Sequence, residues 1–276
     1  MTFLKDLKKH PIAVFGLALI SLVIFTAIFA PILAPFDPNS QELSRRLTEP
    51  FVTSNLLGTD EFGRDILSRI IYGSRISLFV GFISIGISLT IGIPLGVLAG
   101  YYGGKVDSII LRFTDIMLAF PSILLAIMIV SVLRPGLTNA MIAIGIVGIP
   151  QYIRLVRATV LVEKSNEYPE AANAAGFGDF HTMFIEILPN CLAPIIVQAT
   201  LGFAGAILEA AGLGFLGLGA QPPQPEWGAM LAQARPLILR AWWAITFPGI
   251  AILITVLGFN LFGDGLRDIL DPKIKD

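Results

Sequence analysis

Residues 76–100 read ISLFVGFISIGISLTIGIPLGVLAG and contain no charged side chain over 25 positions. An α-helix of this length is about 38 Å long, whereas the hydrocarbon core of a bilayer is about 30 Å thick. Because a spanning helix needs about 20 mostly apolar residues, this stretch predicts a transmembrane helix. It places the chain among membrane proteins before any other segment is considered.

Five further apolar stretches flank this one. The first, residues 12–34, is also uncharged and follows three lysines, as the apolar core of a signal peptide does. At 23 residues it is longer than the 7–15 residues of such a core, so we interpret it as a retained first helix. The other four lie at about residues 106–133, 137–152, 192–219 and 242–262. The sequence therefore predicts an all-α polytopic membrane protein with six transmembrane helices.

The composition of the 276-residue chain agrees with this class. Hydrophobic residues make up 55% and charged residues 14%, whereas soluble domains carry about 25% charged residues. Such a chain has too few polar groups for a soluble surface, which disfavours a soluble enzyme, a nucleic-acid-binding protein and a disordered protein. The single cysteine, Cys191, excludes an internal disulfide, and two histidines offer little for a zinc site. We expect no metal site and no nucleic-acid partner.

The basic residues predict the orientation in the membrane. With the N-terminus in the cytoplasm, all seven lysines and four arginines fall inside, against eight arginines outside. Because cytoplasmic loops are enriched in Lys and Arg, we expect both termini inside. We divide the chain into an N-terminal region with the first helix and an outer loop (1–75), a five-helix core with an inner loop at about 153–190 (76–264), and a cytoplasmic tail (265–276).

The inner loop contains a short helical pattern with clear start and stop signals. Residues 167–176 read EYPEAANAAG. Pro169 suits the first turn, where its missing N–H is not needed, and Glu170 places negative charge at the positive end of the helix dipole. Gly176 suits a left-handed stop just after the alanines. On the pattern alone, this helix is either a docking surface or part of a solvated hairpin without a partner.

At this point the sequence resembles a known family. The spacing of Glu170-Ala171-Ala172, Gly176 and Ile187-Leu188-Pro189 is similar to the cytoplasmic signature of ABC-importer permeases. The chain departs from the wider family form at Glu186, where the family has isoleucine. The resemblance implies that Glu170, Ala171, Ala172 and Gly176 belong to a coupling helix that docks into a groove of an ATP-hydrolysing subunit.

Two other regions carry the same resemblance. Residues 57–65, LGTDEFGRD, are similar to the outer-loop signature of the peptide and nickel branch of these permeases. Residues 215–228 and 247–272 are similar to the second permease subunit of bacterial dipeptide importers. The resemblance implies a type I ABC importer permease fold in the lipid of the bacterial cytoplasmic (inner) membrane. It also implies a second homologous permease, two ATPase subunits that hold ATP and Mg²⁺, and an extracytoplasmic substrate-binding protein.

The outer-loop signature also has a local physical interpretation. Thr59 suits the N-cap of a helix that runs to about Tyr72. Asp60 with Arg64, and Asp65 with Arg69, are both spaced as i,i+4 ion pairs on such a helix. The segment is then either a self-braced structural cap or a surface close to the substrate-binding protein.

Glu209 lies deep inside the predicted fifth helix. Charges inside a bilayer are unfavourable and often functional, so this carboxylate either lines the translocation path or bonds a neighbouring helix. Arg112 and Asp115 are three residues apart near the inner surface, where we expect a structural ion pair.

The chain lacks the motifs of a catalytic subunit. A phosphate-binding loop needs G-x-x-x-x-G-K-[ST], and the nearest match, at Gly104-Lys105, has Ala99 in place of the first glycine. We therefore assign no catalytic residue and expect no cofactor on this chain. We expect a permease subunit that forms half of the pathway of an ATP-driven importer for dipeptides or short oligopeptides. The same importer class with nickel complexes, glutathione or other small solutes is one alternative, and a self-sufficient secondary transporter or channel is another.

Overall fold

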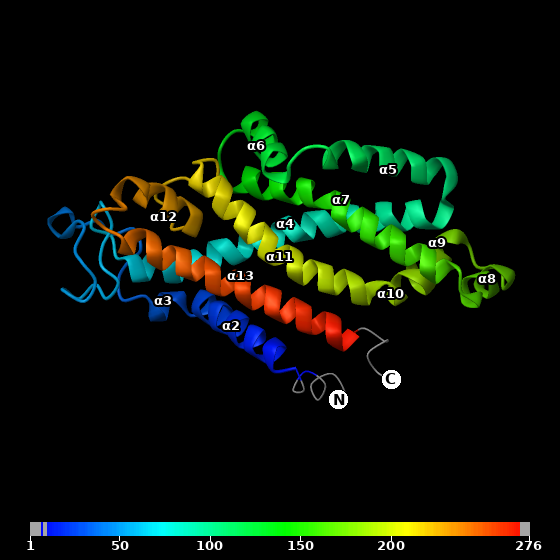
Figure 1. The fold of residues 1–276 in the computed structure, drawn as a ribbon, viewed down its shortest axis with the longest axis horizontal. Helices are drawn as coiled ribbons and strands as arrows, with labels where there is room; N and C mark the ends of the chain where they lie inside the picture. Colours follow the sequence, from blue (N-terminus) through cyan, green and yellow to red (C-terminus); the bar gives the residue numbers. More distant parts are fainter. Residues whose placement is uncertain (1–6, 8–9, 271–276) are drawn as a thin grey trace.

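The computed structural model describes Leu7 and residues 10–270, and this part of the chain is largely helical. Five of its helices are long and apolar enough to cross a membrane individually. In chain order these are α2 (Pro11–Ile28), α4 (Ile66–Tyr102), α7 (Leu137–Lys164), α11 (Leu192–Phe215) and α13 (Trp243–Leu270). Figure 1 shows them extending along the long axis of the molecule.

The predicted third span is bent. It consists of α5 (Gly104–Leu118) and α6 (Ser122–Leu133), which meet at 91° and together qualify as a sixth span. Pro121 adopts an extended conformation between them (ψ 133°). Proline disfavours the helical conformation at the preceding residue, here Phe120, so the helix ends before this pair and restarts after it. The six predicted segments are confirmed, but the third is not a straight helix.

The short elements gather at the two ends of the bundle. At one end lie α8 (Glu167–Ala174), α9 (Asp179–His181), the π-helix η2 (Thr182–Ile187) and α10 (Leu188–Asn190). At the other lie α3 (Ala30–Leu33), η1 (Leu43–Arg45), α12 (Trp227–Ala234) and η3 (Arg235–Leu237). In Figure 1, the start of α2 and the end of α13 face the side of the molecule that carries α8, and α8 extends beyond both. Residues 265–270, predicted as tail, extend α13, and 271–276 lie outside the described residues.

Helices α4 and α7 pack most closely, through three glycines of α4. A Cβ added at Gly92 or Gly96 would lie 2.6 or 2.7 Å from the Cβ of Tyr152 or Val156. Gly100 meets Val160 in the same way, at 2.8 Å. Spacing of four residues places small positions on one face, and small residues let membrane helices approach closely. The glycine ladder is therefore a packing feature.

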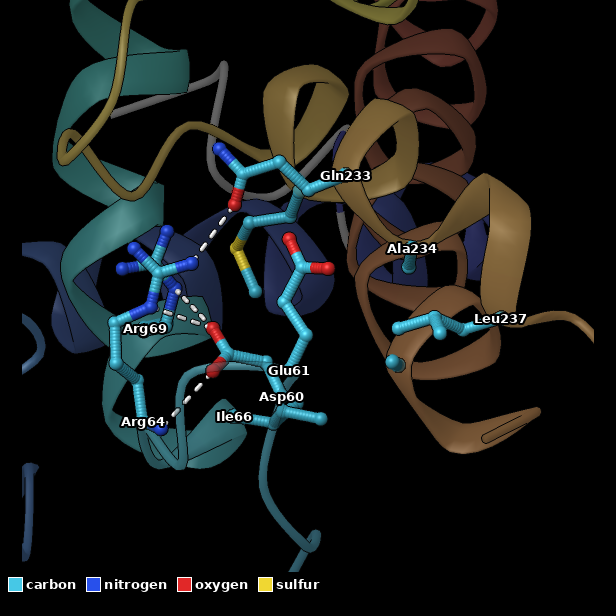
Figure 2. Close-up of a pocket in the computed structure, with 10 residues that line it drawn as sticks. Asp60, Glu61, Arg64, Ile66, Arg69, Gln233, Ala234 and Leu237 are labelled. Atoms are coloured by element: carbon cyan, nitrogen blue, oxygen red, sulfur yellow. Dashed lines mark hydrogen bonds and ion pairs between the residues drawn. The ribbon is translucent and has the colours of Figure 1, made fainter. Parts of the chain in front are cut away.

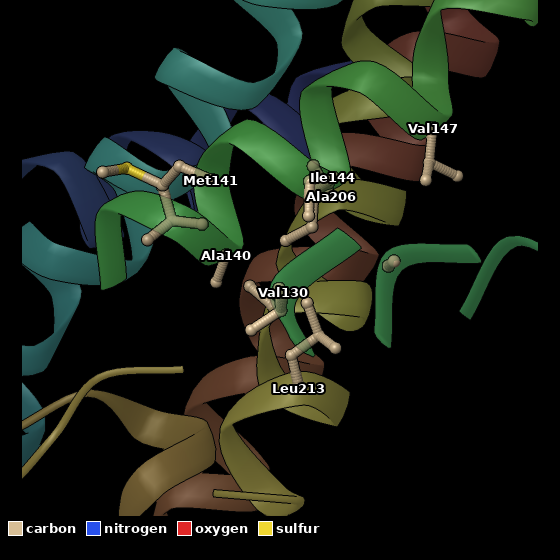
Figure 3. Packing of buried hydrophobic residues seen from close by; sticks show 11 residues of the cluster. Val130, Ala140, Met141, Ile144, Val147, Ala206 and Leu213 are labelled. Atoms are coloured by element: carbon tan, nitrogen blue, oxygen red, sulfur yellow. The ribbon is translucent and has the colours of Figure 1, made fainter. Parts of the chain in front are cut away.

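A buried apolar cluster joins α6, α7 and α11 (Figure 3). Its members include Val130 from α6, Ile144 from α7 and Leu213 from α11, each at most 3% exposed. Beside it, the Ser88 hydroxyl of α4 donates to the Gly145 carbonyl of α7 over 2.7 Å. Such hydrogen bonds satisfy polar groups away from water. This core fixes the bent α5–α6 pair against the bundle.

The outer loop folds into a cap on α4, α12 and α13, shown in Figure 2. Arg64 lies at its centre, 2% exposed. Its Nε is 2.6 Å from Asp60 Oδ2, and its Nη2 donates to Gln233 Oε1 over 2.8 Å. The Trp243 indole N–H donates to the Thr59 carbonyl over 3.1 Å. The Asp60–Arg64 pair is thus confirmed, and it belongs to a braced cap.

Three details of the outer-loop prediction are wrong. The predicted helix does not end near Tyr72 but continues as α4 to Tyr102. The helix begins at Ile66, with the Asp65 carboxylate accepting from the Ser68 N–H, so Asp65 and not Thr59 is the N-cap. Asp65 also accepts from Asn55, and Arg69 instead lies 3.8 Å from Asp60. Residues 57–65 form a tight loop because Gly58 and Gly63 have positive φ, which ends any helical pattern there.

The predicted ion pair between Arg112 and Asp115 is also wrong. Asp115 pairs with Arg154 of α7 at 2.5 Å, and Arg112 makes no ion pair within residues 10–270. A second pair, Asp107 with Arg157, forms two hydrogen bonds of 2.5 and 2.6 Å. Both carboxylates thus join α5 to the neighbouring helix.

Candidate functional site

The predicted coupling helix is present as α8 and lies at one tip of the molecule. Glu170 and Ala171 are exposed, Ala172 is half-buried, and Pro169 is buried beneath them. Glu167 and Glu170 occupy the first turn, where the N-terminal end of the helix dipole favours negative charge. The helix therefore presents an acidic, small-residue surface outward.

Gly176 ends this helix with the predicted left-handed turn, at φ 90°. Its N–H donates to the Asn173 carbonyl over 3.0 Å, and the next N–H, of Phe177, donates to Ala172 over 3.2 Å. These two bonds are the Schellman pattern, which satisfies carbonyls at a helix end. The glycine is needed for its backbone conformation, because no atom lies within 4 Å of an added Cβ.

Hydrogen bonds hold α8 to the ends of the long helices. The Tyr168 hydroxyl donates to Glu163 of α7 over 2.9 Å and accepts from Asn190 of α10 over 3.3 Å. Burial and, next, the Glu163 carboxylate raise the pKa of Tyr168 to about 12, so the hydroxyl stays a donor. The Asn173 amide oxygen accepts from Thr182 of η2 over 3.0 Å.

The sequence after α8 predicts a short helix over residues 180–186 with Asp179 as its N-cap, and the structure differs from this prediction. Asp179 is the first residue of α9 and does not cap it. Its carboxylate accepts from the hydroxyls of Tyr101 and Tyr102, over 3.0 and 3.1 Å, and so joins the loop to α4. The following six residues form the π-helix η2, a rare element that often marks functional sites. The sequence offered no signal for it.

The second predicted site is at Glu209, which is half-buried and lines a cavity of about 280 Å³. The cavity lies between the α5–α6 bend, α4, α7 and α11. Its lining side chains with hydrogen-bonding groups are Ser84, Ser88, Ser122, Gln151, Tyr152, Gln198 and Glu209. The two glutamines were not among the site residues predicted from the sequence. On α11, however, Gln198, Gly202, Gly205 and Glu209 recur at helical spacing and share one face.

A larger cavity of about 860 Å³ adjoins the first and shares Gln198 and Leu201 with it. Its lining also includes Glu163 near the end of α7 and Arg267 near the end of α13. The two cavities thus follow one face of α11, from Glu209 to the end of the bundle that carries α8.

Comparison with known proteins assigns the family. The family model described as "Binding-protein-dependent transport system inner membrane component" matches residues 92–276. The chain belongs to this family. A second model, the N-terminal TM domain of oligopeptide transport permease C, matches residues 2–50. The resemblance found in the sequence is therefore confirmed, and the chain is a multi-pass inner-membrane permease.

Individual relatives match nearly the whole chain. The di/tripeptide transport system permease protein DppC of Pseudomonas aeruginosa is 54% identical over 95% of this chain and 88% of its own length. The dipeptide transport system permease protein DppC of Escherichia coli K12 is 53% identical, over 97% and 91%. The glutathione transport system permease protein GsiD of Pectobacterium atrosepticum is 46% identical, over 98% and 89%.

A solved structure shows the fold. The MetNI methionine ABC transporter in inward-facing conformations matches with a TM-score of 0.62 at 20% identity, over 75% of this chain and 98% of that chain. The type I ABC importer permease fold is thereby confirmed. Family membership implies partners of two kinds, an ATPase and a substrate-binding protein.

Proposed function

We propose that this permease imports dipeptides or short oligopeptides as one transmembrane subunit of an ATP-driven importer. The observation that carries the proposal is 53–55% identity to dipeptide permease subunits over nearly the whole chain. The family assignment argues against a self-sufficient secondary transporter or channel, which needs neither an ATPase nor a binding protein.

The assembly that we propose contains this chain, a second homologous permease, two ATPase subunits and an extracytoplasmic substrate-binding protein. ATP and Mg²⁺ bind to the ATPase subunits, and this chain takes no part in the hydrolysis chemistry. Polar groups such as Glu209, Gln151 and Gln198 are unfavourable against lipid. Their cavity is therefore covered by another protein or by water, as expected where two permeases share one pathway. Glu209 is then a path-lining residue.

We propose that α8 docks on an ATPase subunit through Glu170, Ala171, Ala172 and Gly176. Its exposed surface and its bonds to α7, α10 and η2 support this role. Closure of the ATPases on ATP would move α8 and, with it, the long helices, so that access alternates between the two sides. With α8 in the cytoplasm, both ends of the chain lie there too.

An uptake assay tests the proposal. Cells or vesicles that contain the assembled importer should accumulate a labelled dipeptide only with ATP and the binding protein present. Uptake of a labelled dipeptide without ATP, or no uptake with every subunit present, would contradict it. The 46% identity to a glutathione permease favours glutathione as the second candidate substrate. Competition between excess glutathione and the labelled dipeptide, set against competition by unlabelled dipeptide, decides between them.

A further inference from the structure

The cavity at Glu209 has a chemical character that the transport function leaves unspecified. Among the described residues that line it, Glu209 is the one with a formal charge, and the others are neutral. The half-buried side chain places its carboxylate at the wall of a membrane-depth cavity, partly shielded from water. Electrostatic interactions are stronger there than in bulk water, so this carboxylate strongly favours a positively charged group beside it.

The rest of the lining suits a small ligand with amide groups. The volume of about 280 Å³ lies near the lower limit for pockets that hold small organic molecules. Gly202 and Gly205 form part of the wall, and no atom lies within 4 Å of a Cβ added at Gly205, so space is open beside the Glu209 face of α11. Gln151 and Gln198 carry amide groups that both donate and accept hydrogen bonds, as a peptide bond requires.

We propose that Glu209 recognises the protonated amino terminus of a short peptide inside the membrane part of the pathway. The inference rests on the proposed transport of peptides, and it specifies which group of the peptide the permease itself recognises. The ammonium group pairs with the carboxylate, and the peptide's own carboxylate is repelled from it. The peptide therefore enters the cavity with its amino end at Glu209 and its carboxyl end pointing away from the Glu209 carboxylate.

Direct binding to the assembled importer tests this recognition without the selectivity of the binding protein. The complex, in nanodiscs and without nucleotide or binding protein, is titrated with labelled alanyl-alanine and with its N-acetyl form, which lacks the ammonium group. We expect the free amine to bind at least about tenfold more tightly to the unmodified complex. Glu209→Gln keeps the size and hydrogen-bonding capacity but removes the charge, and it should erase this preference. Glu42→Gln, on the exposed outer loop, is the matched control and should retain it.

Several results would overturn the inference. Equal affinity of the unmodified complex for the two peptides refutes it, as does binding of neither, and both tests hold even where Glu209→Gln does not assemble. A preference that persists in an assembled Glu209→Gln complex refutes it as well. None of these results touches the transport proposal, which stands on ATP-dependent uptake with the binding protein present. Loss of uptake by the unmodified importer would contradict that proposal separately.

Discussion

Replacing Gly176 with valine isolates the left-handed turn that ends α8. The glycine has a φ of 90°, and an added Cβ would meet no atom within 4 Å, so the perturbation acts on the backbone alone. A left-handed conformation costs an ordinary residue about 1–2 kcal/mol, and a β-branched residue more. One to two kcal/mol corresponds to a factor of about 5–30 in population. The Schellman bonds from Gly176 and Phe177 form only in this turn, so the ratio of formed to broken bonds falls by the same factor.

We therefore expect substrate-stimulated ATP hydrolysis by the assembled importer to fall in Gly176→Val, by up to roughly 30-fold. Insertion should be unaffected, since the position lies outside the apolar spans, and the amount of chain in the membrane is measured in parallel. Gly178→Val is the matched control. Gly178 also meets no atom within 4 Å, but its φ of −79° and ψ of 164° are extended values that valine adopts readily. Normal stimulation in Gly176→Val, or an equal loss in both variants, would refute the reasoning.

Three further predictions follow from the packing, the orientation and one buried carboxylate. Gly96→Val places a Cβ 2.7 Å from the Val156 Cβ and should destabilise the complex by about 1–3 kcal/mol in thermal unfolding, whereas Gly86→Val, with open space around it, should not. A cysteine at exposed Ser40 should react with an impermeant thiol reagent in intact cells and one at Asn173 only after permeabilisation; the reverse pattern would invert the orientation. Burial, the largest influence, raises the pKa of Glu226 above its usual 4.5, so the ionised form is penalised in the folded state. Stability from this group should rise as the pH falls from the raised pKa to about 4.5, and Glu226→Gln should remove that rise from the pH dependence of the melting temperature.

The spans and the inner-loop turn were predictable because each depends on residues adjacent in sequence. Whether a run of apolar residues can cross the bilayer depends only on its own length, and residues 76–100 are long enough. The turn at Gly176 requires a positive φ at that one residue, which glycine adopts readily. The bend at Pro121 belongs to the same class, since Phe120-Pro121 is a local helix-ending signal. It was missed because hydropathy alone continues through it.

The predictions of ion pairs between Asp65 and Arg69 and between Arg112 and Asp115 were wrong for the opposite reason, because the fold offers both carboxylates other partners. Spacing of three or four residues predicts a pair only where both residues lie on a helix and no better partner arrives from elsewhere. Asp65 lies just before α4 and is used as its cap, and Asp115 faces Arg154 of α7. A tertiary partner 39 positions away leaves no trace in the local pattern. The same limit applies to Gln151 and Gln198, whose neutral side chains become notable only when the fold places them around one cavity.

A short stretch of chain joins the two predicted sites, and it is helical apart from the turn at residues 175–178 and a single turn residue, Cys191. From α8 the chain passes through α9, η2 and α10 directly into α11, which carries Glu209. Leu192 and Glu209 are 17 positions apart, about 26 Å along the helix, and a helix held by packing moves as a rigid rod. The π-helix η2 lies between the proposed docking surface on α8 and the helix α11, and its backbone hydrogen bonds have a different register from those of the neighbouring α-helices. On the proposed docking, a displacement of α8 would reach the cavity through the consecutive elements α9, η2, α10 and α11, in addition to the side-chain bonds from α8 to α7 and η2. In the proposed mechanism, this stretch of chain connects the docking helix at the molecule's tip to the cavity at Glu209.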